Sequence, residues 1–213
     1  MAKNEPFLTR QEIPEQARKC GNCRHWHFYP QKSAVAITFA GHKPNCVMQI
    51  LDDRQIRQKI RRIAIEILER NFGAPAIILA GLNNNGYEFA QLIVNELKTI
   101  APASTDITLT RIRLNPANPV EYDPCIELPA EALREKPVII VDDVANTGRT
   151  VFYAVQPLLS VIPAKVEVAV LVDRTHKSFP IKADYVGMSL ATTMLDNIDV
   201  QIHEKGKMAV NLV

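Results

Sequence analysis

The segment with the clearest chemical potential reads VIIVDDVANTGRT, from Val138 to Thr150. A continuous aliphatic run such as 138–141 is typical of a strand covered on both faces, so Asp142 and Asp143 are expected at its carboxyl end. Two adjacent carboxylates there can accept hydrogen bonds from the vicinal hydroxyls of a sugar, or can orient a divalent cation and its waters. Both uses stay open at this point.

The residues that follow the carboxylates are suited to an anion. The stretch Ala145–Thr150 leads into an expected helix, so backbone N–H groups, the helix dipole and two threonine hydroxyls, Thr147 and Thr150, converge on one point. Carboxylates for a ribose beside a cradle for a phosphate predict a phosphorylated sugar as the ligand. The alternative is a strand end whose polar turn only caps a helix. The spacing is not that of a P-loop, which needs Gly-Lys-Ser/Thr.

The elements around this segment must place it at the edge of a sheet. Strand and helix patterns alternate, with strands expected at 76–80, 105–113, 138–141 and 166–172. Helices are expected from about 51 to 72, around the apolar positions 89, 90, 93, 94 and 97, and from about 150 to 161. Such alternation predicts an α/β fold with an open, mainly parallel sheet flanked by helices. In these sheets ligands bind beyond the carboxyl ends of the strands. Two loops border that edge, a glycine-bounded one at 81–86 and a Pro/Asn-rich one at 115–124 that is expected to be mobile.

The first expected helix has its own start signal and a mixed surface. Asp52 followed by Gln55 is a plausible capping box. One helical face is apolar, with Ile56, Ile60, Ile63, Ala64 and Ile67. The rest carries a basic set of Arg54, Arg57, Lys59, Arg61 and Arg62. We expect a solvated face, with contact to a polyanion or another subunit as the alternative.

Length and composition favour one sizeable domain with an appendage. The chain has 213 residues, of which 47% are hydrophobic, and no run approaches the roughly 18 apolar residues of a membrane span. No signal-peptide pattern opens it, so a soluble cytoplasmic protein without membrane contact is expected. Residues 1–47 carry seven Lys/Arg and three Asp/Glu, which leaves a net charge of −2 for the rest. The main body is therefore not a polycation of the kind that captures nucleic acid strongly.

Residues 1–47 are interpreted as an irregular extension, with a domain at 48–213. Prolines are spaced through the extension and no sustained strand or helix period is evident. It is expected to be poorly ordered, and the alternative is that Met48 is the natural start. A less favoured hypothesis is a Cys₃His zinc site made of Cys20, Cys23, His42 and Cys46.

The motif resembles the signature with which type I phosphoribosyltransferases hold 5-phosphoribosyl 1-diphosphate (PRPP). A second stretch, LVDRTHKSFPIKADYVG at 171–187, is similar to pyrimidine operon attenuation regulators that have uracil phosphoribosyltransferase activity. The resemblance extends over roughly residues 49–202 and includes DITLTR at 106–111. It implies the type I phosphoribosyltransferase fold, with a small hood and a mobile loop.

The resemblance also implies roles for individual residues. Asp142 and Asp143 would bind the ribose hydroxyls and serve catalysis. The PRPP-binding set would continue through Val144, Ala145, Asn146, Thr147, Gly148, Arg149 and Thr150. Substrate contacts would come from Asn84, Asn85, Arg111, Arg174 and Ile198, with Ile198 near the base.

The reaction that the resemblance implies is transfer of the phosphoribosyl group to a base, with uracil expected, with loss of diphosphate and with Mg²⁺ bound to PRPP. Two stretches depart from the family pattern. The diphosphate-loop stretch Asn83–Asn85 holds no basic residue, and 192–196 reads TTMLD where the family commonly has Ser, Lys/Arg and Glu. These departures predict PRPP binding with uracil transfer that is weak or directed to another base. The alternative function is a nucleotide-sensing, RNA-binding attenuator of pyrimidine genes. The family also implies a homo-oligomer, a dimer or larger.

Overall fold

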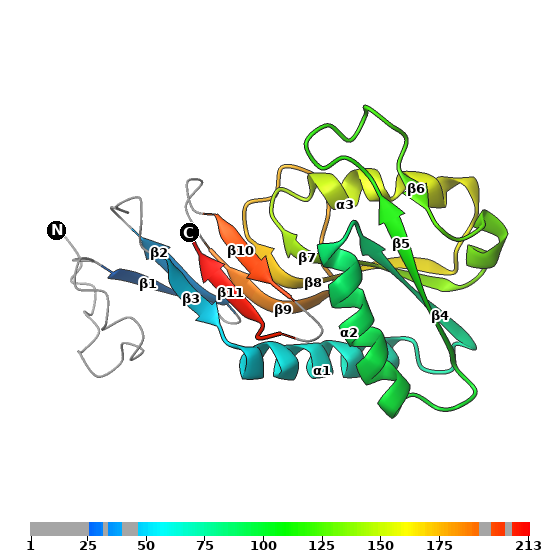
Figure 1. Ribbon diagram of the computed structural model, residues 1–213, viewed down its shortest axis with the longest axis horizontal. Coiled ribbons are helices and arrows are strands. Elements are labelled where there is room, and N and C mark those ends of the chain that lie inside the picture. Colours follow the sequence, from blue (N-terminus) through cyan, green and yellow to red (C-terminus); the bar gives the residue numbers. More distant parts are fainter. Residues whose placement is uncertain (1–25, 32–33, 40–46, 192–196, 203–205) are drawn as a thin grey trace.

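The computed structural model describes the backbone at 26–31 and 34–39, and the whole structure at 47–191, 197–202 and 206–213. Six strands form the main sheet in the order β6-β5-β4-β7-β8-β9 (Figure 1). Their bounds are β4 Ala76–Leu82, β5 Asp106–Arg113, β6 Cys125–Ile126, β7 Pro137–Ala145, β8 Lys165–Arg174 and β9 Tyr185–Leu190. All neighbours are parallel except β5 and β6. This confirms the expected α/β class with an open, mainly parallel sheet.

Helices cover both faces of this sheet. The helices α1 (Asp53–Arg70) and α2 (Asn85–Ile100) pack on one face, and the short α3 (Arg149–Ala154) packs on the other (Figure 1). Two 3₁₀ segments, η2 (Ala130–Leu133) and η3 (Gln156–Ser160), join α3 on its face. Alternate residues of the central strands therefore enter different cores. In β7, for example, Ile139 joins the α1/α2 core and Ile140 joins the α3 core.

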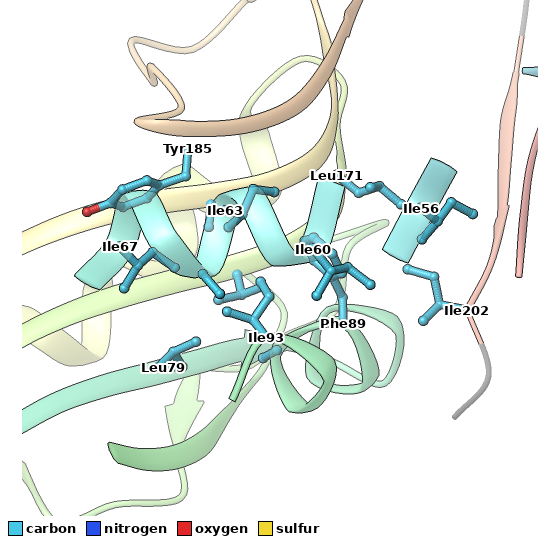
Figure 2. Close-up of a cluster of buried hydrophobic side chains, with 14 of the residues drawn as sticks. Ile56, Ile60, Ile63, Ile67, Leu79, Phe89, Ile93, Leu171, Tyr185 and Ile202 are labelled. Carbon is cyan, nitrogen blue, oxygen red and sulfur yellow. The ribbon is translucent and has the colours of Figure 1, made fainter. Parts of the chain in front are cut away.

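The helix α1 forms as its sequence predicts. Gln55 N–H donates to the Asp52 carboxylate over 2.8 Å, and Asp52 N–H donates back to the Gln55 side chain over 3.0 Å, which completes the capping box. The apolar face is buried against α2 and the sheet, as Figure 2 shows for Ile56, Ile63 and Ile67. Each fully buried isoleucine contributes about 1.5–3 kcal/mol of hydrophobic stabilisation.

The basic side of α1 is only partly a solvated face. The Lys59 ammonium donates to the Gly187 carbonyl over 2.9 Å, and the Arg62 guanidinium donates to the Val186 carbonyl over 2.6 Å. Burial lowers the pKa of Lys59. These two cations therefore attach α1 to β9, while Arg54 and Arg61 stay exposed.

Strands from both ends of the expected domain form a small antiparallel sheet in the order β10-β11-β3. Its strands are β3 (Met48–Leu51), β10 (Ile198–Gln201) and β11 (Ala209–Leu212). It packs on the α1/α2 core and is the small hood that was expected. A separate hairpin joins β1 (Trp26–Gln31) and β2 (Ala34–Phe39), within the segment predicted to be irregular. Prolines obscured a short pattern of aromatic and β-branched residues that favours strands there.

Three predicted boundaries near the site were wrong. The expected loop at 81–86 shrinks to a two-residue turn, because Gly81 and Leu82 stay paired with β5 and α2 begins at Asn85. The strand expected at 138–141 continues to Ala145, since its last residues still pair with β8. The helix expected over 150–161 ends at Ala154, because Pro157 lacks the N–H that would donate to the carbonyl four residues earlier, and the chain continues as the 3₁₀ segment η3.

Candidate functional site

A pocket of about 850 Å³ opens where β4, β5 and β7 end. Its walls come from three segments: the turn between β4 and α2, the carboxyl end of β7, and the connection between β5 and β6. The lining residues of the first two are Leu82, Asn83, Asn84, Asn85, Asp142, Asp143, Val144 and Thr150. The connection adds Arg113, Leu114, Asn115, Pro116, Tyr122, Asp123 and Cys125. The predicted ligand edge of the sheet is therefore concave and polar.

The two adjacent carboxylates lie on the last part of β7. Asp142 accepts a hydrogen bond from Asp143 N–H over 3.0 Å, and Asp143 accepts from Val144 N–H over 2.9 Å and from the Asn85 amide over 3.1 Å. Burial, and then the neighbouring Asp143 charge, raises the pKa of Asp142 well above its usual range. The apo site therefore holds a carboxylate whose charge lacks compensation, and it favours a ligand that brings hydroxyl donors or a cation.

Three consecutive asparagines, Asn83–Asn85, form the two-residue turn between β4 and α2 and the first residue of α2, and each makes a different contact; together they are called the asparagine turn. Asn83 adopts a positive φ of 50° and its side chain accepts from Leu114 N–H over 3.1 Å, which holds the turn to the end of β5. Asn84 accepts from the Arg111 guanidinium over 3.3 Å, and that guanidinium lies 4.0 Å from the ring centre of Tyr87. Asn85 reaches across to Asp143. The turn thus links β5 with the carboxylates of β7.

This turn approaches β7 very closely. A Cβ atom added to Gly86 would lie 2.5 Å from the Val141 carbonyl oxygen, a distance that real side chains do not adopt. Only glycine lets the first turn of α2 pack on the strand directly before Asp142. The asparagine turn and the carboxylates are therefore held in one fixed relation.

The stretch 145–150 is a turn whose backbone carbonyls accept hydrogen bonds from residues 177–179. The Lys177 ammonium donates to the carbonyls of Ala145 and Asn146 over 2.9 and 3.2 Å. The Thr147 carbonyl accepts from two backbone N–H groups, at 178 and 179, over 3.0 and 3.1 Å. Gly148 has a φ of 82° and turns the chain into α3. Because these carbonyls point to the segment 177–179, the opposite side of the turn is left to backbone donors and to Thr150, which lines the pocket.

The connection between β5 and β6 lies against this turn. The Arg149 guanidinium donates to the Pro116 carbonyl over 2.8 Å, and the Gln156 amide donates to Asp123 over 3.0 Å. Within the connection, the Asn115 amide donates to Glu121 over 2.6 Å. The stretch 115–124 therefore forms the third wall of the pocket, and its mobility stays a prediction.

Comparison with known proteins identifies the family. The model of the phosphoribosyl transferase domain matches residues 47–204, which hold every part of the pocket.

The chain belongs to the phosphoribosyltransferase family.

Curated relatives narrow the resemblance within this family. The phosphoribosyltransferase is 38% identical over 164 residues to the "Bifunctional protein PyrR" of Bacillus pumilus (strain SAFR-032), with 73% of this chain and 90% of the relative covered. It is also 38% identical over 160 residues to the protein of the same name from Clostridium botulinum (strain Alaska E43 / Type E3), with coverage of 73% and 89%. The predicted resemblance is thereby confirmed.

Solved structures confirm the fold. A hypoxanthine-guanine phosphoribosyltransferase from Bacillus anthracis superposes with a TM-score of 0.62 at 19% identity, over 78% of this chain and 97% of that chain. A hypoxanthine phosphoribosyltransferase from Staphylococcus aureus superposes with a TM-score of 0.55 at 17% identity, over 66% and 76%. At these identities the likeness establishes the type I fold alone.

The phosphoribosyltransferase brings six of the fourteen predicted site residues together in the lining of the pocket. Asp142, Asp143, Val144, Thr150 and the pair 84–85 line one pocket. Arg111 stands behind Asn84, outside the lining. From the turn 145–150 only Thr150 lines the pocket, and two more distant predicted residues also lie outside the lining. Arg174 is only 5% exposed at the end of β8, and Ile198 packs against the α1/α2 core from β10. The proposed zinc ligands at 20–46 and the stretch 192–196 lie outside the described residues.

Sequence reasoning missed two cations of this phosphoribosyltransferase. Lys177 donates to backbone carbonyls of the turn 145–150 and also pairs with Asp173. Arg113 lines the pocket itself. The signal for Lys177 was a basic residue inside the family-like stretch 171–187. No local signal marked Arg113, because its place depends on the pairing of β5 with β4.

Metal and membrane features can be stated for the described part of the chain. No three His, Cys, Asp or Glu side chains gather there as metal ligands would. None of the described helices has the length and apolar character needed to cross a membrane.

Proposed function

We propose that this phosphoribosyltransferase binds PRPP across the pocket and transfers its phosphoribosyl group to uracil, forming UMP and diphosphate. The observation that supports it best is that three elements contribute to one pocket: the carboxylates Asp142 and Asp143, the turn 145–150 through Thr150, and the asparagines 83–85. They suit the three parts of PRPP, which are the ribose hydroxyls, the 5-phosphate and the diphosphate.

The placement follows from the donors and acceptors of each segment. The ribose 2′- and 3′-hydroxyls donate to Asp142 and Asp143, which have acceptor capacity beyond their present bonds. The 5-phosphate accepts from backbone N–H groups of the turn 145–150 and from Thr150. The diphosphate lies at the asparagine turn, where the Asn85 amide and the start of α2 offer donors.

The site also fits Mg²⁺ that arrives bound to PRPP. Two carboxylates stand side by side, and the pKa of Asp142 is raised by burial and by Asp143, so a cation stabilises their charged form. Asp142 and Asp143 would hold the ion through waters or directly. When bound, Mg²⁺ neutralises charge on the departing diphosphate.

The chemistry is a substitution at the anomeric carbon. The bond from C1 to the diphosphate oxygen breaks, a bond from C1 to a base nitrogen forms, and that nitrogen loses its proton. Positive charge develops on the ribose ring in an oxocarbenium-like transition state, so Asp142 and Asp143 act by positioning and by electrostatic stabilisation. The connection 115–124 closes the pocket on one side and limits entry of water, which would hydrolyse PRPP.

The choice of uracil rests on the resemblance of the stretch 171–187 to uracil-type members of the family. A product assay tests it: PRPP and Mg²⁺ are incubated with uracil, hypoxanthine, guanine or orotate, and nucleotides are separated. UMP as the main product supports the proposal. Calorimetry with PRPP and Mg²⁺ is run beside it, and absence of heat of binding contradicts the PRPP site itself.

A second candidate is regulation of pyrimidine genes through RNA. The relatives carry the word "bifunctional" in their name, and exposed arginines on α1 offer phosphate contacts, chiefly Arg54 and Arg61. A gel shift with the leader of the protein's own pyrimidine operon, with and without UMP, tests this function. No shift at low salt contradicts it, whereas a shift that UMP strengthens supports it.

The domain boundary and the assembly are proposals as well. The matched family region at 47–204 supports a transferase domain over 48–213, with 1–47 as a separate extension. A protein that begins at Met48 and keeps full PRPP affinity supports this boundary. A homo-oligomer in the cytoplasm is proposed from the family alone, and light scattering of the purified protein tests its size.

A further inference from the structure

Only one positively charged side chain is found among the described residues that line the pocket. Among the described residues that line the pocket, three are carboxylates, Asp123, Asp142 and Asp143, and one is a guanidinium, Arg113. The asparagine turn holds no charge. A diphosphate needs positive partners, and amide donors do not neutralise its charge.

Nearby cations outside the lining are engaged elsewhere. The Arg111 guanidinium is bound by Asn84 and stacked on Tyr87, and the Arg149 guanidinium holds the Pro116 carbonyl. Lys177 is partly buried beside the turn 145–150, where it donates to the carbonyls of Ala145 and Asn146. None of these three lines the pocket.

Arg113 is placed where it meets the asparagine turn. It is the last residue of β5, and both of its neighbours are bonded to Asn83: the Ile112 carbonyl accepts from Asn83 N–H over 2.9 Å, and Leu114 N–H donates to the Asn83 side chain. It also pairs with Cys125 at the base of the connection 115–124. Arg113 thus joins the turn to the connection that closes the pocket.

The present partner of Arg113 is easily replaced. Its guanidinium bonds one oxygen of Glu127 at 2.8 and 2.9 Å, and the two side chains are 60% and 45% exposed. An exposed pair of this kind is weak, and a diphosphate offers more charge and a geometry that suits the planar guanidinium.

We propose that Arg113 binds the diphosphate of PRPP, exchanging Glu127 for the ligand, and so supplies the positive charge that the asparagine turn lacks. This rests on the proposed function. Arg113 is then a specificity-determining residue for the diphosphate end of the ligand, while the carboxylates and the turn 145–150 hold the ribose 5-phosphate end.

The test compares ligands with and without the diphosphate. Arg113→Gln is titrated with PRPP and Mg²⁺, with diphosphate and Mg²⁺, and with ribose 5-phosphate. Loss of one charge-assisted hydrogen-bonding group predicts affinities for PRPP and diphosphate about 10-fold to 100-fold lower. Affinity for ribose 5-phosphate should stay within about twofold, since Arg113 is at the other end of the pocket. Arg113→Lys keeps the charge and should recover part of the loss.

Two further variants serve as controls. Arg134→Gln breaks a similar exposed pair, with Glu131, away from the pocket, and should leave all three affinities unchanged. Glu127→Gln removes the competing partner and should leave PRPP affinity equal or raise it. Equal PRPP affinity in wild type and Arg113→Gln overturns the inference alone, as does an equal loss for ribose 5-phosphate. A wild-type protein that binds no PRPP overturns the proposed function with it.

Discussion

Polar groups gather at both ends of the main sheet, and the two groups are built differently. At the amino end, Glu167 accepts from the Tyr185 hydroxyl over 2.9 Å, from the Asn71 amide over 3.2 Å and from the Lys165 ammonium over 3.0 Å. At the carboxyl end, Asp142 has one backbone donor and a second carboxylate beside it. Glu167 therefore has three hydrogen-bond donors from the protein, whereas Asp142 has one.

The difference explains why the two ends serve different purposes. Glu167 with its three partners ties α1, β8 and β9 together, and Arg70 lies over the Tyr185 ring at 4.9 Å. Burial, and then Glu167, raises the pKa of Tyr185 above its usual range. A network of this kind, in which the carboxylate has three donors, contributes stability without a ligand. An incomplete one at a concave edge is expected where a ligand supplies the missing partners.

Asp143→Asn should have the largest effect on activity of the variants at the carboxyl end of the sheet. The variant keeps the shape but loses the charge, so kcat/KM with PRPP should fall by about 100-fold or more, as when one preorganised electrostatic contact is removed. The melting temperature should change little. Asp106→Asn is the matched control, because Asp106 is an exposed aspartate at the opposite end of β5. Activity within a few-fold of wild type would contradict a role for Asp143.

Asp142→Asn should lower activity and raise stability together. The pKa of Asp142 is raised in the folded state, so the protonated carboxyl favours folding and its ionisation opposes folding. This contribution to stability is fully present below the unfolded pKa and is lost as the pH rises through the folded pKa. The variant cannot ionise, so in the apo state it should be more stable than wild type at neutral and higher pH. The difference should vanish below about pH 4. Denaturant unfolding over a pH series checks this, and parallel pH profiles would refute it.

Tyr185→Phe should show the opposite behaviour at the amino end. Glu167 and Asn71 each lose a hydrogen-bond partner, which should cost about 1–3 kcal/mol of unfolding free energy. PRPP affinity should stay as in wild type. Tyr122→Phe, at a 71% exposed tyrosine, is the stability control. A loss of PRPP affinity in Tyr185→Phe at temperatures where it is folded would erase the distinction between the two ends.

Asn83 should give the smallest change in unfolding free energy. It lies at the carboxyl end of the sheet, yet its contacts hold the backbone turn together. Asn83→Ala removes the bond to Leu114 N–H and places a residue that disfavours positive φ there, which should cost about 1–2 kcal/mol. Asn83→Gly loses the bond but not the backbone freedom, so it should cost less. Chemical denaturation of both variants measures the order. Equal costs would show that the backbone conformation contributes nothing.

The sequence predicted those features that depend on neighbouring residues. The capping box of α1, its apolar face and the run of aliphatics before Asp142 are local patterns, and the structure contains each of them. The carboxylates and the asparagines 84–85 were predicted to belong to one site, and they line one pocket. Predictions of this kind succeed because the 3.6-residue and two-residue periods report burial directly.

Features that depend on distant pairing could not be predicted. Arg113 enters the pocket because β5 pairs with β4 in one register, and a sequence pattern does not fix that register. The solvated-face prediction for α1 holds only in part, because Lys59 and Arg62 also donate to carbonyls of β9, more than 120 residues away. The helix after the motif was overestimated because its apolar period continues past Pro157 into η3.

The contact between Gly86 and the Val141 carbonyl has a consequence for redesign. A library aimed at a new acceptor base gains nothing from diversity at position 86 in α2, because any side chain at that position pushes the helix off the strand that carries Asp142. The connection 115–124 carries no such constraint from the sheet. Variation is best concentrated there, where new shapes can be sampled at little risk to the rest of the catalyst.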